Sequence, residues 1–287
     1  MQWKKMDEAS FPVSFQAAEL FLRKRENSCT AAISRYLESF SAQRKAWLGF
    51  DKQGELRAFL LFAPYGSLYP VLGDSSATGA ESNLRKLPPN PIAWNLRAIQ
   101  GTRNDVDTAL RLCGKRVRGK KEVIDYSLML LDSTPSAASL AAGPASLRIR
   151  RADRQDTDLL LPLRLAYELE EVLPAGAPPN IPATRLSLER SLVERLVLVA
   201  ELDDAVVGTA ATNARAFNRD QVGGVYVVPA LRGGGIGTRI VAELGALLRK
   251  ENRGAVLFVK NDNIPAIRAY ERIGFLAGGP YRIVYFS

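Results

Sequence analysis

The sequence predicts an α+β protein, of the α/β mixed-sheet kind, in which each of two domains carries a mixed sheet flanked by helices. Both halves of the 287-residue chain show the same coarse order of helix, hairpin, strand, turn, helix and strand. Between them, residues 133–146 are small and uncharged and include two prolines, a composition typical of a flexible linker. We therefore expect a first domain at 1–132 and a second at 147–287, each of ordinary domain size.

In the first half, the spacing of apolar residues predicts a helix, a hairpin closed by a glycine-containing turn, and a Gly- and Pro-rich loop before the last elements. The expected elements are a helix at 17–40, strands at 46–50 and 56–63, a loop at 64–95, a strand at 96–99, a helix at 104–112 and a strand at 123–131.

In the second half, Asp153 and Asp156 cap a first helix that reaches about Glu171, and four prolines between 172 and 184 end it. The other expected elements are strands at 147–151, 196–201, 206–214, 222–228, 255–259 and 282–286, and helices at 187–195, 239–250 and 264–272.

Composition excludes several classes of protein. Apolar residues make up 47% and charged residues 24%, which argues against a disordered or collagen-like chain. The chain has no histidine, which removes mechanisms and zinc sites that depend on imidazole, and its two cysteines, Cys29 and Cys113, lack metal-binding spacing. We therefore expect no metal.

The first 30 residues are charged throughout and no run of 18 apolar residues exists, so we expect a cytoplasmic protein without a membrane partner.

The net charge is +9, and the densest basic run is Lys115–Lys121. No aromatic residue lies within this run to stack on bases, so we expect a solvated loop and no nucleic-acid partner. Binding of a polyanion through this run is kept as a third hypothesis.

The segment Val225–Thr238 predicts an anion site. A β-branched strand ends at Pro229, and four of the five positions 233–237 before an amphipathic helix are glycine. Glycines permit positive φ and close approach, so successive N–H groups can converge on a phosphate at the start of the helix. The segment lacks the Lys-Ser/Thr of a P-loop and the spacing of a dinucleotide fold, and a mobile glycine turn is the alternative interpretation.

A second motif follows 26 residues after the glycines, Asn263-x-x-Ala266-x-x-x-Tyr270-x-x-x-Gly274-Phe275. Together with Arg232-x-x-Gly235-x-Gly237, it resembles the GNAT superfamily of acyl-CoA-dependent N-acyltransferases, over residues 147–287. The resemblance implies a splayed central sheet and acetyl-CoA as co-substrate, with the pantetheine arm along the strand and the pyrophosphate in the glycine loop. The implied cofactor-binding residues are Val225, Tyr226, Val227, Arg232, Gly233, Gly234, Gly235, Ile236, Gly237, Thr238 and Asn263.

The resemblance also implies that Tyr270 is the general acid, since a protonated phenol can donate to the departing sulfur. The amine of the acceptor would attack directly. The strands carry no carboxylate where many relatives place a general base, so the base stays open. Glu170 and Glu171, beside the proline-rich segment, are the candidate substrate-binding residues, and a solvated helix end is the alternative for both.

Residues 1–132 resemble, more weakly, the N-terminal portion of a bacterial tandem-GNAT group. The loop expected after the strand at 96–99 keeps a single glycine, Gly101, so we expect no acetyl-CoA turnover in this half. Packing, acceptor recognition or homodimer formation is its expected role. The leading hypothesis is an N-acetyltransferase acting on a primary amine of a small molecule or peptide, and the alternative is a non-catalytic acyl-CoA-binding sensor.

Overall fold

The chain forms two compact units. The computed structural model describes residues 1–6, 11–37, 45–63, 66–73, 87–88, 96–114, 119, 121–173 and 176–286. Met1–Leu128 together with Gly278–Ser287 make the first unit, and Met129–Ala277 make the second. The expected bounds, 1–132 and 147–287, differ from those of the two units. Residues 129–146 belong to the second unit, and residues 278–287 belong to the first.

The first unit is a mixed sheet with helices on both faces. Its elements are β1 (Gln2–Lys5), α1 (Phe11–Arg23), α2 (Glu26–Leu37), β2 (Lys45–Phe50), β3 (Leu56–Ala63), β4 (Ser67–Leu72), β5 (Ala98–Thr102), α3 (Arg103–Cys113), the first part of β6 (Lys121–Leu131) and most of β12 (Leu276–Phe286). The strand order is β1-β2-β3-β4-β5-β12-β6, and from β1 to β12 only β4 and β5 are parallel.

Side chains of β3 alternate between the two helical layers of this unit. The ring of Phe59 meets Tyr36 of α2 edge-on, with centroids 5.4 Å apart. Its neighbour Leu60 joins the cluster that contains Val106 of α3. Successive residues of a strand point to opposite faces, so α2 and α3 cover opposite sides of the sheet.

Three expectations for the first unit need correction. The helix expected at 17–40 is two helices, α1 and α2. The loop expected at 64–95 contains strand β4, in which Pro70 is paired with Leu60 although it has no N–H to donate. Gly101 lies inside β5, paired with Arg282, so the strand does not end at 99 and Gly101 forms no loop. The rest of 74–95, apart from 87–88, lies outside the described residues.

The second unit has the same layered arrangement. Its elements are α4 (Ala137–Leu140), β7 (Arg148–Arg151), a 3₁₀ turn η5 (Arg154–Asp156), α5 (Thr157–Tyr167), a π-helical turn η6 (Glu168–Val172), α6 (Ile181–Glu194), β8 (Val197–Leu202), β9 (Ala205–Arg215), β10 (Arg219–Val227), a 3₁₀ turn η7 (Pro229–Leu231), α7 (Ile236–Lys250), β11 (Gly254–Lys260) and α8 (Ile264–Ile273). The strand order is β6-β11-β10-β9-β8-β7, of which β6 contributes its last residues from Met129 on, and β10 and β11 are parallel.

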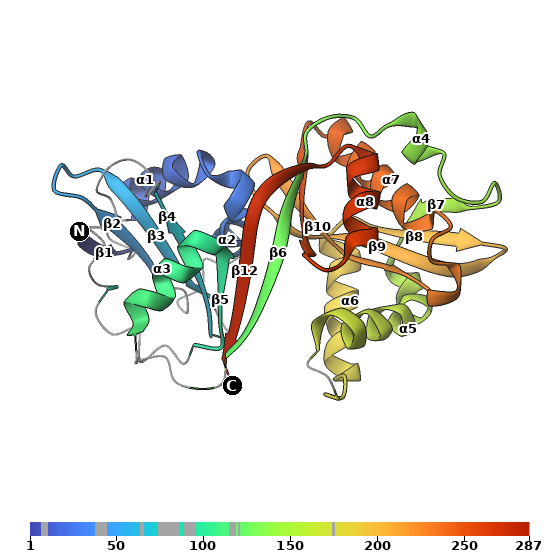
Figure 1. Ribbon diagram of the computed structural model, residues 1–287, viewed down its shortest axis with the longest axis horizontal. Helices are drawn as coiled ribbons and strands as arrows, with labels where there is room; N and C mark the ends of the chain where they lie inside the picture. Colours follow the sequence, from blue (N-terminus) through green and yellow to red (C-terminus); the bar gives the residue numbers. More distant parts are fainter. Residues whose placement is uncertain are drawn as a thin grey trace. The chain divides into compact units, whose positions relative to one another are not determined.

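Successive side chains of β8, like those of β3, point to opposite helical layers. Val199 belongs to the core cluster under α5 and α6, and its neighbour Leu198 belongs to the cluster under α7 and α8. Figure 1 shows the two helical pairs on either side of the β7–β10 strands. The amphipathic face predicted for α7 is therefore buried against one side of the sheet.

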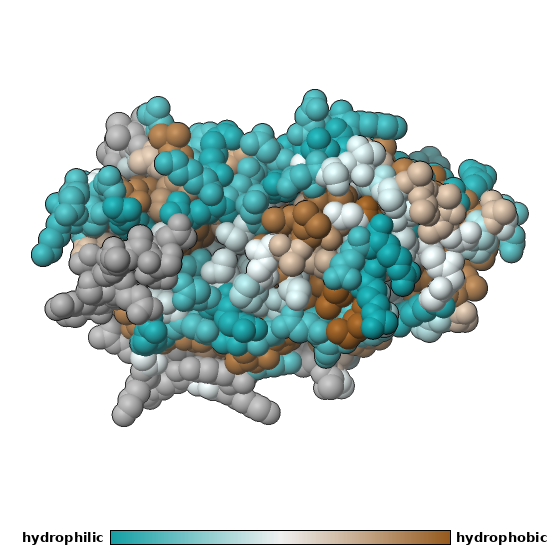
Figure 2. Space-filling view, turned by 45° about the horizontal axis from the view of Figure 1, so that its top comes forward, coloured by the Kyte–Doolittle hydropathy of each residue, from teal (hydrophilic) through white to brown (hydrophobic). Residues whose placement is uncertain are grey.

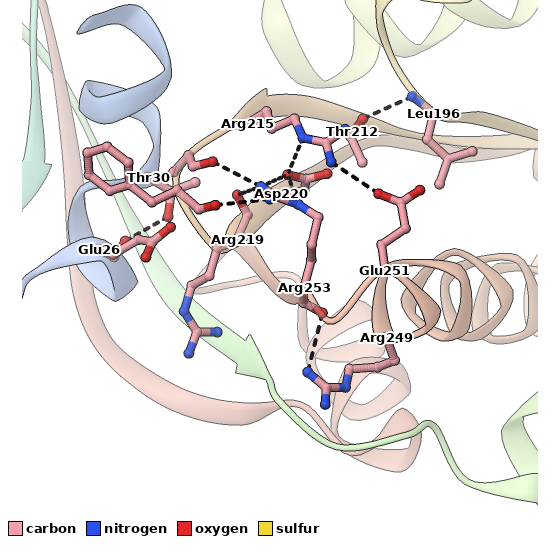
Figure 3. Close-up of polar contacts among 12 residues, drawn as sticks. Glu26, Thr30, Leu196, Thr212, Arg215, Arg219, Asp220, Arg249, Glu251 and Arg253 are labelled. Atoms are coloured by element: carbon pink, nitrogen blue, oxygen red, sulfur yellow. Dashed lines mark hydrogen bonds and ion pairs between the residues drawn. The ribbon is translucent and has the colours of Figure 1, made fainter. Parts of the chain in front are cut away.

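An ion pair fixes the end at which β10 and β11 begin (Figure 3). Arg253 donates to Asp220 at 2.6 Å and also to the backbone oxygens of Ala216, Phe217 and Arg219. The Asp220 side chain is 3% exposed. Removing one partner of such a pair leaves an uncompensated buried charge, so the pair holds the strand starts in one geometry.

The segment expected as a flexible linker packs within the second unit. Ser136 and Ser139 each donate a side-chain hydroxyl to the backbone oxygen of Arg272, at the end of α8. Further along, Gly143 lies against the glycine loop, and a Cβ on Gly235 would come within 2.7 Å of the Gly143 nitrogen. Residues 133–146 are therefore ordered parts of this unit.

Polar side chains cover most of the face drawn in Figure 2, with hydrophobic patches among them. No helix among the described residues is both long and apolar enough to cross a membrane. The basic run at 115–121 falls mostly outside the described residues, which include only 119 and 121 of it.

Candidate active site

Two parallel strands separate in the second unit. β10 and β11 are joined in register over four residue pairs, the last of which is Val222 with Leu257. Both strands continue, to Val227 and Lys260, but among the described residues they form no further pair with each other. A bulge of β10 against β9 begins after Gly223, and bulges bend a strand away from its neighbour. The sheet is therefore splayed at this point, as the resemblance predicts.

The glycine loop lies at the end of β10 and exposes a row of backbone donors. Gly233 has φ +82° and Gly235 has φ +86°, conformations that side chains disfavour. The first helical bond of α7 runs from Arg239 N to the Gly235 oxygen, at 3.0 Å. No described residue accepts a hydrogen bond from the six N–H groups of Gly233 to Thr238. Such a row at a helix start, where the helix dipole is positive, is a binding site for an anion.

Arg232 binds Glu170, at the end of the first-helix region, and the end of β10. Its two terminal nitrogens donate to the carboxylate of Glu170 at 2.6 and 2.8 Å, and its Nε donates to the Val227 oxygen at 3.0 Å. The hydrogen bonds from Arg232 lower the pKa of Glu170, and its positive charge adds to the shift. A carboxylate with a lowered pKa is a weaker base, so this geometry favours a structural task for Glu170.

Glu171 is paired separately, with the strand on the other side of the splay. Its carboxylate lies 2.9 Å from the Lys260 ammonium, at the last residue of β11. The π-helical turn brings this about, since Leu173 N bonds to the Glu168 oxygen five residues earlier. Two adjacent glutamates thus reach two cations, Arg232 in the loop after β10 and Lys260 at the end of β11.

Tyr270 lies on α8 against Phe275, with ring centroids 5.8 Å apart. Burial raises the pKa of its hydroxyl, and the nearby Tyr167 and Glu171 raise it further. The phenol therefore stays protonated at neutral pH. On the same helix, Asn263 accepts the Ala266 N–H at 3.2 Å as the N-cap. Its side-chain oxygen thus holds the helix start.

The remaining residues assigned to the cofactor lie as the strand pattern requires. Tyr226 is buried, while Val225 and Val227 alternate with it and are half-buried. The guanidinium of Arg232 stands 5.2 Å from the Tyr226 ring centre. Ile236 and Thr238 are buried in the first turn of α7, so that turn offers its backbone to a ligand.

Tyr167, the last residue of α5, was not singled out from the sequence. The Arg164 guanidinium lies 5.5 Å from its ring centre, and Arg164 also approaches Gly224 of the bulge. Burial raises the pKa of Tyr167. The negative charge of Glu171 raises this pKa further, and the positive charge of Lys260 lowers it. It therefore shares its surroundings with Tyr270. A tyrosine in a Leu-rich helix carries no sequence signal of this position.

The first unit repeats part of this arrangement. β4 and β5 are parallel and are joined through two residue pairs, Ser67 with Ala98 and Leu68 with Ile99. The segment that follows β4, where the second unit has its glycine loop, lies mostly outside the described residues.

Comparisons with known proteins agree with this arrangement. The family model described as the acetyltransferase (GNAT) family matches residues 166–275. The search of curated proteins found no match. Among solved structures, a Drosophila protein is similar with a TM-score of 0.64 and 12% identity, covering 99% of this chain and 98% of that chain.

Two further structures carry a family description. A GNAT-family acetyltransferase from Colwellia psychrerythraea has a TM-score of 0.59 and 14% identity, with 100% of each chain covered. A tandem GNAT protein from the clavulanic acid biosynthesis pathway has a TM-score of 0.58 and 14% identity, covering 100% of this chain and 98% of that chain. At these identities the likeness concerns the fold. The splay, the glycine loop and the family match coincide in the second unit: residues 166–275 match the model of the GNAT acetyltransferase family, and the chain has the fold of tandem GNAT proteins.

Proposed function

We propose that the second unit transfers the acetyl group of acetyl-CoA to a primary amine. The observation that carries this proposal is the row of six N–H groups, Gly233 to Thr238, that have no acceptor among the described residues. Buried or aligned donors without partners are costly, so a ligand that supplies oxygens is favoured there.

The residues present fit coenzyme A. The open side of Gly233, where a Cβ would meet nothing within 4 Å, leaves room for a diphosphate against the backbone. The backbone of 225–227, released from β11, can hydrogen bond the pantetheine arm. The co-substrate supplies an acyl group on a thioester, which is reactive toward an amine.

Tyr270 is proposed as the general acid. Its raised pKa keeps the hydroxyl protonated, so it can give a proton to the sulfur as the carbon–sulfur bond breaks and the carbon–nitrogen bond forms. Asn263, engaged as N-cap, is assigned the positioning of α8 and a contact with the cofactor through its side-chain nitrogen.

Glu171 is the better candidate for receiving the proton that the amine loses. Both glutamates are paired, but Glu171 has a single contact with Lys260, whereas Glu170 is held by two bonds from Arg232. A carboxylate retains further acceptor positions after one such contact.

The test is calorimetric titration of coenzyme A, followed by thiol release from acetyl-CoA with a set of primary amines. We expect binding and amine-dependent thiol release. In Tyr270→Phe we expect kcat to fall about 100-fold, with a KM for acetyl-CoA within about twofold of the parent. Tyr285→Phe, at a 39% exposed position of β12, is the control.

The sensor hypothesis predicts a different outcome. It requires binding of acetyl-CoA without thiol release for any amine. Absence of heat on titration of coenzyme A would contradict both hypotheses, and unchanged kcat in Tyr270→Phe would remove this residue from the mechanism.

A further inference from the structure

A partly exposed ion pair joins the turn after α5 to the end of β11. Glu171 comes from the π-helical turn and Lys260 from the last position of β11, and their charged atoms are 2.9 Å apart. Their side chains are 31% and 28% exposed, so solvent and solutes reach both. The negative charge of Glu171 adds to the raised pKa of Tyr270, so the pair lies within electrostatic reach of the proposed general acid.

The turn that carries Glu171 is fixed independently of this pair. Arg232 holds Glu170 through two hydrogen bonds and is itself bonded to the end of β10. On the other side, Glu168 accepts hydrogen bonds from Arg164 at 3.1 Å and Thr184 at 2.6 Å. The carboxylate of Glu171 would therefore stay in place if Lys260 moved away from it.

An incoming amine changes the charge balance of this pair. An amine in its ammonium form can bond to Glu171 by replacing Lys260, which leaves the lysine ammonium without its partner. An unpaired charge in partly desolvated surroundings is unfavourable. An acceptor that carries a carboxylate as well as an amine pairs with both residues and leaves neither charge unbalanced.

We propose that Glu171 and Lys260 form the acceptor subsite and that its preferred occupant is an amino-carboxylate zwitterion. Glu171 binds the ammonium group and Lys260 binds the carboxylate group of the same molecule. This inference rests on the proposed acetyl transfer and names the class of its acceptor.

The test compares three acceptors with the same carbon chain on the full-length protein. 4-Aminobutanoate ends in a carboxylate, butylamine in a methyl group and 1,4-diaminobutane in a second ammonium. We expect kcat/KM for 4-aminobutanoate to exceed that for butylamine about tenfold, and 1,4-diaminobutane to be the poorest of the three. Calorimetric titration of the same compounds into protein saturated with coenzyme A measures the preference without turnover.

Two variants separate this subsite from general charge effects. Lys260→Met is expected to abolish the advantage of 4-aminobutanoate while leaving the KM for acetyl-CoA within about twofold. Lys250→Met removes an exposed lysine at the end of α7 and is expected to leave the preference intact. Lys260→Arg, which keeps the positive charge, is expected to restore most of it.

Equal use of 4-aminobutanoate and butylamine, or a preference that survives in Lys260→Met, would overturn the inference and leave the acetyl-transfer proposal standing. Selective binding of 4-aminobutanoate that Lys260→Met removes, without acetylation of any amine, would support the subsite and overturn acetyl transfer. If coenzyme A itself does not bind, both proposals fail together.

Discussion

Arg150 and Asp156 show how one pair of residues joins β7 to the turn η5 that precedes α5. Arg150 donates to the two carboxylate oxygens of Asp156 at 2.8 and 2.7 Å, and its Nε donates to Glu201 at 2.6 Å. The Asp156 side chain is 7% exposed and also accepts the Asp153 N–H. The bonds from Arg150, ahead of the other causes, lower the pKa of Asp156 below its ordinary value of 3.8.

This lowered pKa predicts acid sensitivity. Because the folded-state pKa lies below the unfolded-state one, the stabilisation is fully present above about pH 4 and is lost as the pH falls through the folded-state pKa. Asp156→Asn should lower the free energy of unfolding at pH 7 by about 1–3 kcal/mol and flatten its decline between about pH 4 and pH 2. Urea unfolding at a series of pH values measures this. Asp158→Asn, at an 81% exposed side chain, is the control, and parallel curves for wild type and Asp156→Asn would contradict the prediction.

Residue-level prediction from the sequence depends on local spacing. The glycines of 233–237 and the Asn263–Tyr270 spacing each lie within one or two turns of chain, and in the structure they form the loop before α7 and the start and body of α8, while their roles stay predictions. The partners of Glu170 and Glu171 are 62 and 89 positions away. Such pairings depend on how elements fold back on one another, and no local pattern encodes them.

At the scale of elements, the segment 136–143 connects the end of α8 with the glycine loop. Two serine hydroxyls bind the last turn of α8, and Gly143, with φ +93°, lies against Gly235. A Cβ on Gly143 would come within 2.9 Å of the Leu147 Cδ2 atom. The backbone of the loop is therefore supported by a close contact between two glycines.

Gly143→Ala should disturb the loop indirectly, because the added Cβ would press on Leu147 and shift a segment that lies against Gly235. We expect a loss of about 1–3 kcal/mol in the free energy of unfolding and about tenfold weaker binding of coenzyme A, from strain at positive φ together with the displaced contact. Gly176→Ala is a matched control, because Gly176 has φ +80° but nothing within 4 Å of its Cβ position. Unfolding and calorimetric titration measure the two effects. Equal losses in both variants would show that backbone strain alone is responsible.

The elements that periodicity could predict are those with an amphipathic or alternating pattern. The hairpins at β2–β3 and β8–β9 and the helix α7 follow such patterns and were predicted. β4 was missed because Pro70 and the surrounding Gly and Ser residues are typical of a loop. Its place between β3 and β5 is decided by the burial of Leu68 and Val71, which is a tertiary effect.

At the scale of the whole molecule, the last strand belongs to the first unit. Residues Tyr281–Tyr285 of β12 pair with β5, and Tyr281 and Val284 are buried there. A chain that ends at Ala277 should therefore lose amide-exchange protection in β5 and α3 while β8 and β9 keep theirs. Hydrogen exchange read by mass spectrometry tests this, and unaltered protection of 98–113 would contradict it.

A milder pair of variants tests the same point without removing chain. Val284→Ala should lower the stability of the first unit by about 1–3 kcal/mol, because Val284 is fully buried. Tyr285→Ala, one position on and 39% exposed, should have a smaller effect. The sequence could not assign β12 to a unit, because alternation identifies a strand but both halves offer similar sheets to receive it.

Because β12 belongs mostly to the first unit, it affects how the chain folds during synthesis. A ribosome that has released the first 128 residues has not yet supplied the strand that follows β5 in its sheet, since residues 278–287 are translated only after the whole of the second unit. Multidomain chains usually fold from the amino terminus during synthesis. The first unit cannot complete its sheet in this way, because it needs residues 278–287. A stop codon ahead of residue 278 would therefore affect the fold of the first unit, whose other residues are 1–128.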